Sequence, residues 1–136
     1  MIKTINISLP VTDLSKSKAF YAALGFTCNP AFSGDTTASM VWSDTISVML
    51  ITHDVWRTFT TRPIPPSTHS EVGFQLSLGN RDAVDAMAAA AEANGGTADI
   101  NPIEDHGFIY TRDLTDPDGH VWGAMWMDRA AMPQNT

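Results

Sequence analysis

The sequence predicts an α+β fold built from two βαβββ modules in tandem. Residues 5–11 and 72–78 each alternate strictly between apolar side chains and polar or small ones, which is typical of a half-buried strand. A helix start follows each of these segments, at Asp13 and at Asn80, and both features recur after 67 residues. This regular recurrence indicates a duplicated supersecondary unit.

Each alternating segment has one apolar face and one face of small or polar residues. The apolar faces consist of Ile5, Ile7, Leu9 and Val11 in the first segment and of Val72, Phe74, Leu76 and Leu78 in the second. The opposite faces consist of Asn6, Ser8 and Pro10 in the first segment and of Gly73, Gln75 and Ser77 in the second. We therefore expect each strand to pack its apolar face against a helix and to leave a small or polar face on the inner side.

A helix is expected directly after each of these strands. Asp13 and Asn80 are suitable N-caps, and Gly25 and Gly95 are expected to end the helices in the left-handed conformation. One helical stripe contains Leu14, Ser17, Tyr21 and Leu24 in the first helix and Val84, Met87 and Ala91 in the second. Each helix thus has one face that can pack on a sheet.

Three more strand-like segments follow each helix. They lie near 27–32, 38–42 and 45–52 in the first half and near 97–100, 108–114 and 120–127 in the second. Turn residues separate the last two in each half, Ser43-Asp44 in one and the DPDG sequence at 116–119 in the other. We expect one domain over 1–136, with module one at about 1–55, a proline-containing connection at about 56–70, module two at about 71–128 and a short C-terminal tail.

Composition excludes several classes of partner. The formal charge of −7 and the pI near 4.7 oppose binding to nucleic acid or to an anionic membrane, both of which require clustered Lys and Arg. No apolar run approaches the roughly 20 residues that cross a bilayer, and the N-terminal residues lack a signal-peptide pattern. Cys28 is the only cysteine, so one chain can form no internal disulfide. We expect a cytoplasmic protein.

The order of elements, the segment LPVTDLSKSKAFYAALGF and the segment DPDGHVW resemble the vicinal oxygen chelate superfamily, which includes glyoxalases, bleomycin-resistance proteins and extradiol dioxygenases. The resemblance covers Ile2 to about Asp128 and is nearest to the lactoylglutathione lyase-like group. It implies an incomplete mixed β-barrel with the helices outside and a pocket between the inner faces. Many members are metal-dependent enzymes, whereas others bind and sequester a drug.

The resemblance also implies four positions at which metal-dependent members place their ligands. In this chain these positions are Asn6, Met49, Gly73 and Gly123. Glycine offers no side-chain donor, and the thioether of methionine is a poor ligand for hard cations. We therefore expect no bound metal and no cofactor, and we leave the catalytic residues unassigned.

Other candidate catalytic groups are weaker. His53, His69, His106 and His120 show no spacing typical of metal ligands, and the chain contains no G-x-S-x-G nucleophile motif. A relocated site that uses His106, His120, Glu71 or Glu104 stays open as an alternative. Such a site would make the protein a metal-dependent lyase or isomerase of the glyoxalase kind.

The favoured interpretation is a metal-free binding protein for a small organic molecule, with an aromatic compound as one candidate ligand. The expected ligand pocket is bounded by Asn6, Met49, Gly73, Gln75 and Gly123, which the resemblance and the alternation place on the inner faces. Trp122 and Trp126 lie on the face opposite Gly123 and are expected in the core. Because each sheet has open edges, we also expect a homodimer. A structural or regulatory dimer with a filled cavity is a further alternative.

Overall fold

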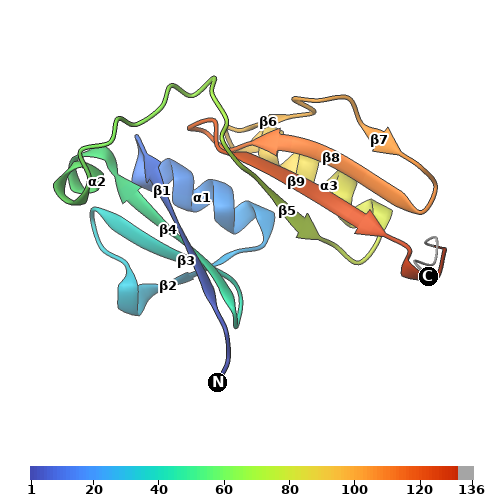
Figure 1. The fold of residues 1–136 in the computed structure, drawn as a ribbon, viewed down its shortest axis with the longest axis horizontal. Coiled ribbons are helices and arrows are strands. Elements are labelled where there is room, and N and C mark those ends of the chain that lie inside the picture. Colours follow the sequence, from blue (N-terminus) through green and yellow to red (C-terminus); the bar gives the residue numbers. More distant parts are fainter. Residues whose placement is uncertain (132–136) are drawn as a thin grey trace. The chain divides into compact units, whose positions relative to one another are not determined.

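In the computed structural model, which describes residues 1–131, the chain forms two compact units that meet in sequence between His69 and Ser70. Each unit contains the βαβββ order of elements, to which the second adds the two-residue strand β7, so the predicted α+β fold of two tandem modules is confirmed (Figure 1). The predicted barrel between the two sheets stays a prediction, as does the single domain. Residues 132–136 of the predicted C-terminal tail lie outside the described part of the chain.

The first unit consists of β1 (Ile5–Val11), α1 (Leu14–Leu24), β2 (Thr27–Asn29), the 3-10 turn η1 (Pro30–Phe32), β3 (Thr37–Ser43), β4 (Ile46–Thr52) and α2 (His53–Phe59). The strand order is β1-β4-β3-β2, with β1 parallel to β4 and the other pairs antiparallel. Helix α1 packs against β2, β3 and β4, which places the apolar core on one side of the sheet.

The second unit consists of β5 (Gly73–Ser77), α3 (Arg81–Ala93), β6 (Thr97–Ala98), β7 (Glu104–Asp105), β8 (Ile109–Thr115), β9 (Val121–Met127) and the 3-10 turn η2 (Arg129–Ala131). The strand order is β5-β9-β8-β6, and β7 pairs with β8. Strand β5 is parallel to β9, as β1 is to β4, so the two sheets repeat the same connection.

The predicted helix caps are confirmed. Asp13 Oδ1 accepts a hydrogen bond from Lys16 N at 3.1 Å, and Asn80 Oδ1 accepts one from Ala83 N at 2.8 Å. Gly25 ends α1 with φ of 110°, in the left-handed region that only glycine enters without strain. Gly95 also has a positive φ, but it directly follows the C-cap of α3.

The buried stripes of both helices are also confirmed. They comprise Leu14, Ser17, Phe20, Tyr21 and Leu24 of α1 and Val84, Met87, Ala88 and Ala91 of α3. In the second unit Trp122 is 1% exposed, and the centroid of its ring lies 4.9 Å from that of the Phe74 ring. Trp126 is only half-buried, because it lies near the end of β9.

One helix is absent from the sequence prediction. Helix α2 directly follows β4 and crosses the expected boundary between module one and the connection. Its seven residues are too few to show a clear helical repeat in the sequence. No helix within residues 1–131 is long and apolar enough to cross a membrane.

Candidate binding site on the first sheet

The side of the first sheet opposite α1 carries two rows of mostly polar residues. In one row Asn6 of β1 lies opposite Ser47 of β4, which in turn lies opposite Val41 of β3. In the next row Ser8, Met49, Ser39 and Asn29 lie across all four strands. Since alternate residues share a face, the apolar residues between them point toward α1 instead.

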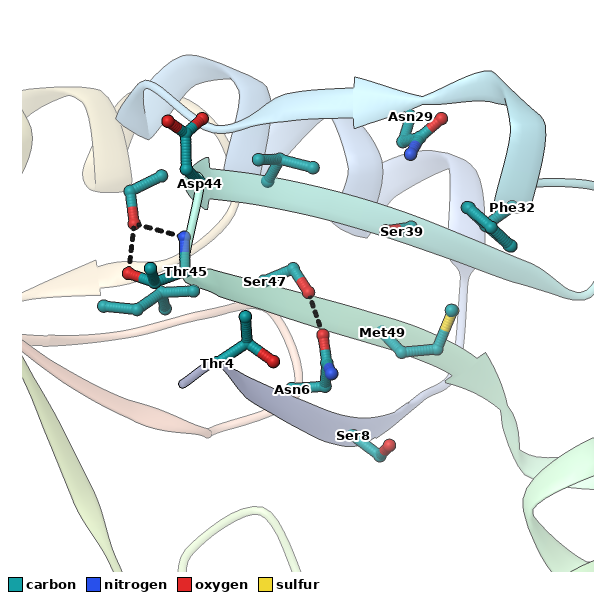
Figure 2. A pocket seen from close by; sticks show the side chains of 13 residues that line it. Thr4, Asn6, Ser8, Asn29, Phe32, Ser39, Asp44, Thr45, Ser47 and Met49 are labelled. Carbon is teal, nitrogen blue, oxygen red and sulfur yellow. Dashed lines mark hydrogen bonds between the residues drawn. The ribbon is translucent and has the colours of Figure 1, made fainter. Parts of the chain in front are cut away.

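This face holds a pocket of about 540 Å³ (Figure 2). Its lining comes from β1 and the residue before it, from β2, η1, β3 and β4, and from the β3–β4 turn. It consists of Thr4, Asn6, Ser8, Asn29, Phe32, Ser39, Val41, Ser43, Asp44, Thr45, Ile46, Ser47 and Met49. The volume lies within the range of roughly 300–1,000 Å³ that is typical of small-molecule sites.

A hydrogen bond fixes the orientation of Asn6 at the middle of the pocket. The Ser47 hydroxyl donates to Asn6 Oδ1 across the β1–β4 pair (Figure 2). The acceptor side of the amide is therefore engaged, while Nδ2 makes no hydrogen bond to another residue in 1–131. This leaves an amide donor for an acceptor group on a ligand.

The segment after β2 brings an aromatic ring to the pocket. Asn29 Oδ1 accepts from Ala31 N at 3.1 Å and so caps η1. Ser33 Oγ donates to Asn29 O at 2.6 Å and accepts from Ser39 N at 3.0 Å, which attaches the segment to β3. Phe32, between these contacts, lines the pocket and is 66% exposed. A large apolar ring exposed to this degree is available to contact a ligand.

The structure divides the five predicted pocket residues between the two units. Asn6 and Met49 both line the pocket of the first unit, on neighbouring rows. Gly73, Gln75 and Gly123 lie together on one face of the second sheet, where Gln75 is directly opposite Gly123. The cavity bounded by all five residues stays a prediction.

Gln75 covers the backbone of Gly123. A Cβ atom added at Gly123 would lie 2.6 Å from Gln75 Cδ, far closer than carbon atoms approach each other. The absence of a side chain at 123 therefore makes room for the Gln75 amide. Sequence alternation gives the face of Gln75 but not the direction of its side chain.

The four positions at which the resemblance implies metal ligands do not suit a divalent cation. Asn6 Oδ1 is engaged by Ser47, Met49 carries a thioether, and Gly73 and Gly123 carry no donor. Within residues 1–131 no group of three or more His, Cys, Asp or Glu side chains is arranged to hold a metal ion.

The alternative relocated site is assembled only in part. His106 Nε2 lies 3.5 Å from Glu104 Oε2, and both side chains are more than 60% exposed. Glu71 is exposed in the segment before β5. His120 follows the DPDG turn, where Asp116 Oδ1 accepts from the backbone N–H groups of Asp118 and His120 at 3.0 and 2.8 Å. The structure therefore assigns this turn a structural role.

A charged cluster between α3 and the second sheet is absent from the sequence prediction. Arg112 donates to both oxygens of Asp99, at 3.0 and 2.7 Å, and to Asp85 at 3.0 Å. Tyr110 donates to the same Asp85 oxygen at 2.5 Å. A signal was present in the sequence, because Tyr110 and Arg112 share one face of β8 with Leu114, which is buried.

These contacts shift the pKa values of the cluster. The hydrogen bond from Tyr110, followed by that from Arg112, lowers the pKa of Asp85, and the hydrogen bond to Asp85 raises the pKa of Tyr110. The hydrogen bonds from Arg112 also lower the pKa of Asp99. Because the charges are paired with one another, the cluster attaches α3 and the segment after β6 to β8.

Residues 3–123 match the sequence model of the Glyoxalase/Bleomycin resistance protein/Dioxygenase superfamily. The chain belongs to this superfamily. The match covers both modules up to Gly123 in β9, in agreement with the resemblance drawn from the DPDGHVW segment. No curated protein matches the chain significantly.

Solved structures of the superfamily fold are similar over nearly the whole chain. A hypothetical protein, SA1046 from S. aureus, has 25% identity and a TM-score of 0.77 and covers 93% of this chain and 95% of its own. A glyoxalase-related enzyme from Fulvimarina pelagi has 16% identity and a TM-score of 0.76, and the match covers 100% of this chain and 94% of that enzyme's chain. TnmS3, an antibiotic binding protein from Streptomyces sp. CB03234, has 23% identity and a TM-score of 0.61, and the match covers 93% of this chain and 97% of the TnmS3 chain.

Proposed function

We propose that this superfamily member binds a small organic molecule with an aromatic part in the pocket on the first sheet, without a metal ion. The pocket itself carries the proposal, because it combines a size suited to small ligands with hydroxyl and amide groups and an exposed aromatic ring. The same fold in TnmS3, titled an antibiotic binding protein, supports a binding role.

The donor set supports the metal-free part of the proposal. Three of the four positions implied for metal ligands lack a side-chain nitrogen or oxygen, so a cation there would be held by Asn6 and water alone. Binding would instead rest on hydrogen bonds from Asn6 Nδ2 and the serine hydroxyls and on contacts with Phe32 and Met49.

A pair of tryptophan variants tests the proposal. Chelator-treated protein is screened by thermal shift against small aromatic compounds, and the hits are retested on Ser8→Trp and Ser15→Trp. Ser8 lines the pocket and is exposed on the edge strand β1, where a tryptophan is compatible with the strand because aromatic residues favour strands. Ser15 is exposed on α1, outside the pocket lining. We expect Ser8→Trp to abolish binding and Ser15→Trp to preserve it. Hits that bind Ser8→Trp as tightly as the wild type would refute the proposed site.

A further inference from the structure

Among residues 1–131, Asp44 is the only charged residue that lines the pocket of the first sheet. It lies in the turn between β3 and β4, and its carboxylate makes no ion pair or hydrogen bond within residues 1–131. No Lys, Arg or His from the described part of the chain lines the pocket. An anionic ligand would therefore meet one carboxylate and no positive charge, whereas a cation would find a partner.

The apolar and charged parts of the pocket lie at opposite ends. Figure 2 shows Asp44 at the β3–β4 turn, Asn6 and Ser47 in the middle, and Phe32 and Met49 toward the other end. At about 3.4 Å per residue, the three steps from Ile46 to Met49 in β4 span roughly 10 Å. A ligand that uses both ends must be elongated, with its cationic group at one end.

The negative charge of the chain does not come from this unit. Residues 1–69 contain four acidic and five basic side chains, so the whole net negative charge of the chain belongs to the second half of the sequence. Asp44 thus acts as a local charge and not as part of a broad negative field. A single neutral substitution at 44 is then sufficient to remove any preference for cations.

We infer that the pocket selects elongated aromatic compounds that carry a cationic group, with the ring against Phe32 and Met49 and the cation at Asp44. This inference rests on the proposed binding function and specifies the class of ligand. A methionine sulfur and an aromatic ring both make favourable contacts with a flat ring, and a carboxylate is the natural partner of a protonated amine.

Three probes of nearly the same shape test the inference. They are 2-naphthylmethylamine, which is a cation at pH 7, the neutral 2-naphthalenemethanol and the anion 2-naphthoate. Each is titrated at low ionic strength into isotope-labelled full-length protein, and amide shifts are followed by NMR. Ligands of this size are expected to bind with Kd on the order of 1 mM. We expect shifts at Asn6, Ser47 and Met49.

Charge preference is read from the ratios of Kd. An exposed carboxylate should favour the amine over the alcohol by about two- to fivefold, and naphthoate should be the weakest. Asp44→Asn should make amine and alcohol equal, whereas Asp35→Asn, an exposed site outside the pocket lining, should keep the preference. Equal binding of all three probes at the pocket would overturn the inference and leave the proposed function standing. No shift at the pocket with any probe would overturn the proposed function itself.

Discussion

The contact between Gln75 and Gly123 gives a prediction whose magnitude follows from the structure. Gly→Ala at a position with compatible backbone angles stabilises a protein by about 0.4–1 kcal/mol, because the unfolded chain loses freedom. Gly123 lies in β9 and is not among the glycines with positive φ, so the backbone accepts alanine. The new Cβ must, however, displace the end of the Gln75 side chain.

The displacement costs up to about 1 kcal/mol, because the atoms in the way belong to an exposed, flexible side chain. Gly123→Ala should therefore leave the free energy of unfolding nearly unchanged in the wild type. In a Gln75→Ala background the obstacle is gone, and the same change should stabilise by about 0.4–1 kcal/mol. The expected coupling between the two sites is about 0.5–1 kcal/mol.

Urea unfolding followed by circular dichroism measures this double-mutant cycle, provided that the m-value stays constant. Gly73→Ala serves as the control, because its Cβ would make an ordinary contact at 3.6 Å with Val121 Cγ1. Gly73→Ala should change the free energy of unfolding by the same amount in the wild type and in the Gln75→Ala background. If Gly123→Ala has equal effects in both backgrounds within about 0.3 kcal/mol, Gln75 does not occupy the space above Gly123.

Three further results are expected. Elemental analysis after dialysis should find no stoichiometric divalent metal; one tightly held ion per wild-type chain, lost together with activity on chelation, would favour the enzyme alternative. If the register implied by the resemblance is right, the variant with Asn6→His, Met49→Glu, Gly73→His and Gly123→Glu should gain metal affinity, and a folded variant that binds no metal would show that the four positions are misaligned. Light scattering at tens of micromolar should give a dimer mass, since the sheets have open edges, and a monomer mass would contradict this. Arg112→Met should destabilise the protein at pH 7. Asp85 and Asp99 have lowered pKa values in the folded state, so their contribution to the free energy of unfolding is present above the unfolded pKa of about 3.9 and is lost as the pH falls further. The difference in free energy of unfolding between Arg112→Met and the wild type should therefore shrink between pH 4 and pH 2. A constant difference would show that the lost contacts are not electrostatic.

The fold was predictable because local rules act strongly in this chain. Strict alternation in β1 and β5, and the N-caps Asp13 and Asn80, each specify one local structure, and they recur at one spacing. The repeat then fixes the order of the elements. Helix α2 and the two-residue strand β7 are too short for such rules to apply.

The pocket was predictable only in part, because alternation gives the face of a residue but not its partner across the sheet. Asn6 and Met49 share a face as expected, yet Asn6 is opposite Ser47, two residues from Met49. Ser39 comes from β3 and Phe32 from η1, and no sequence pattern connects either residue to Asn6.

A crystal structure of the chelator-treated protein with the best screening hit tests the central claim most directly. The account predicts ligand density on the polar face of the first sheet, in contact with Asn6, Ser39 and Met49 and with no metal ion between ligand and protein. Density only at another place, or a ligand held through a metal ion, would contradict it.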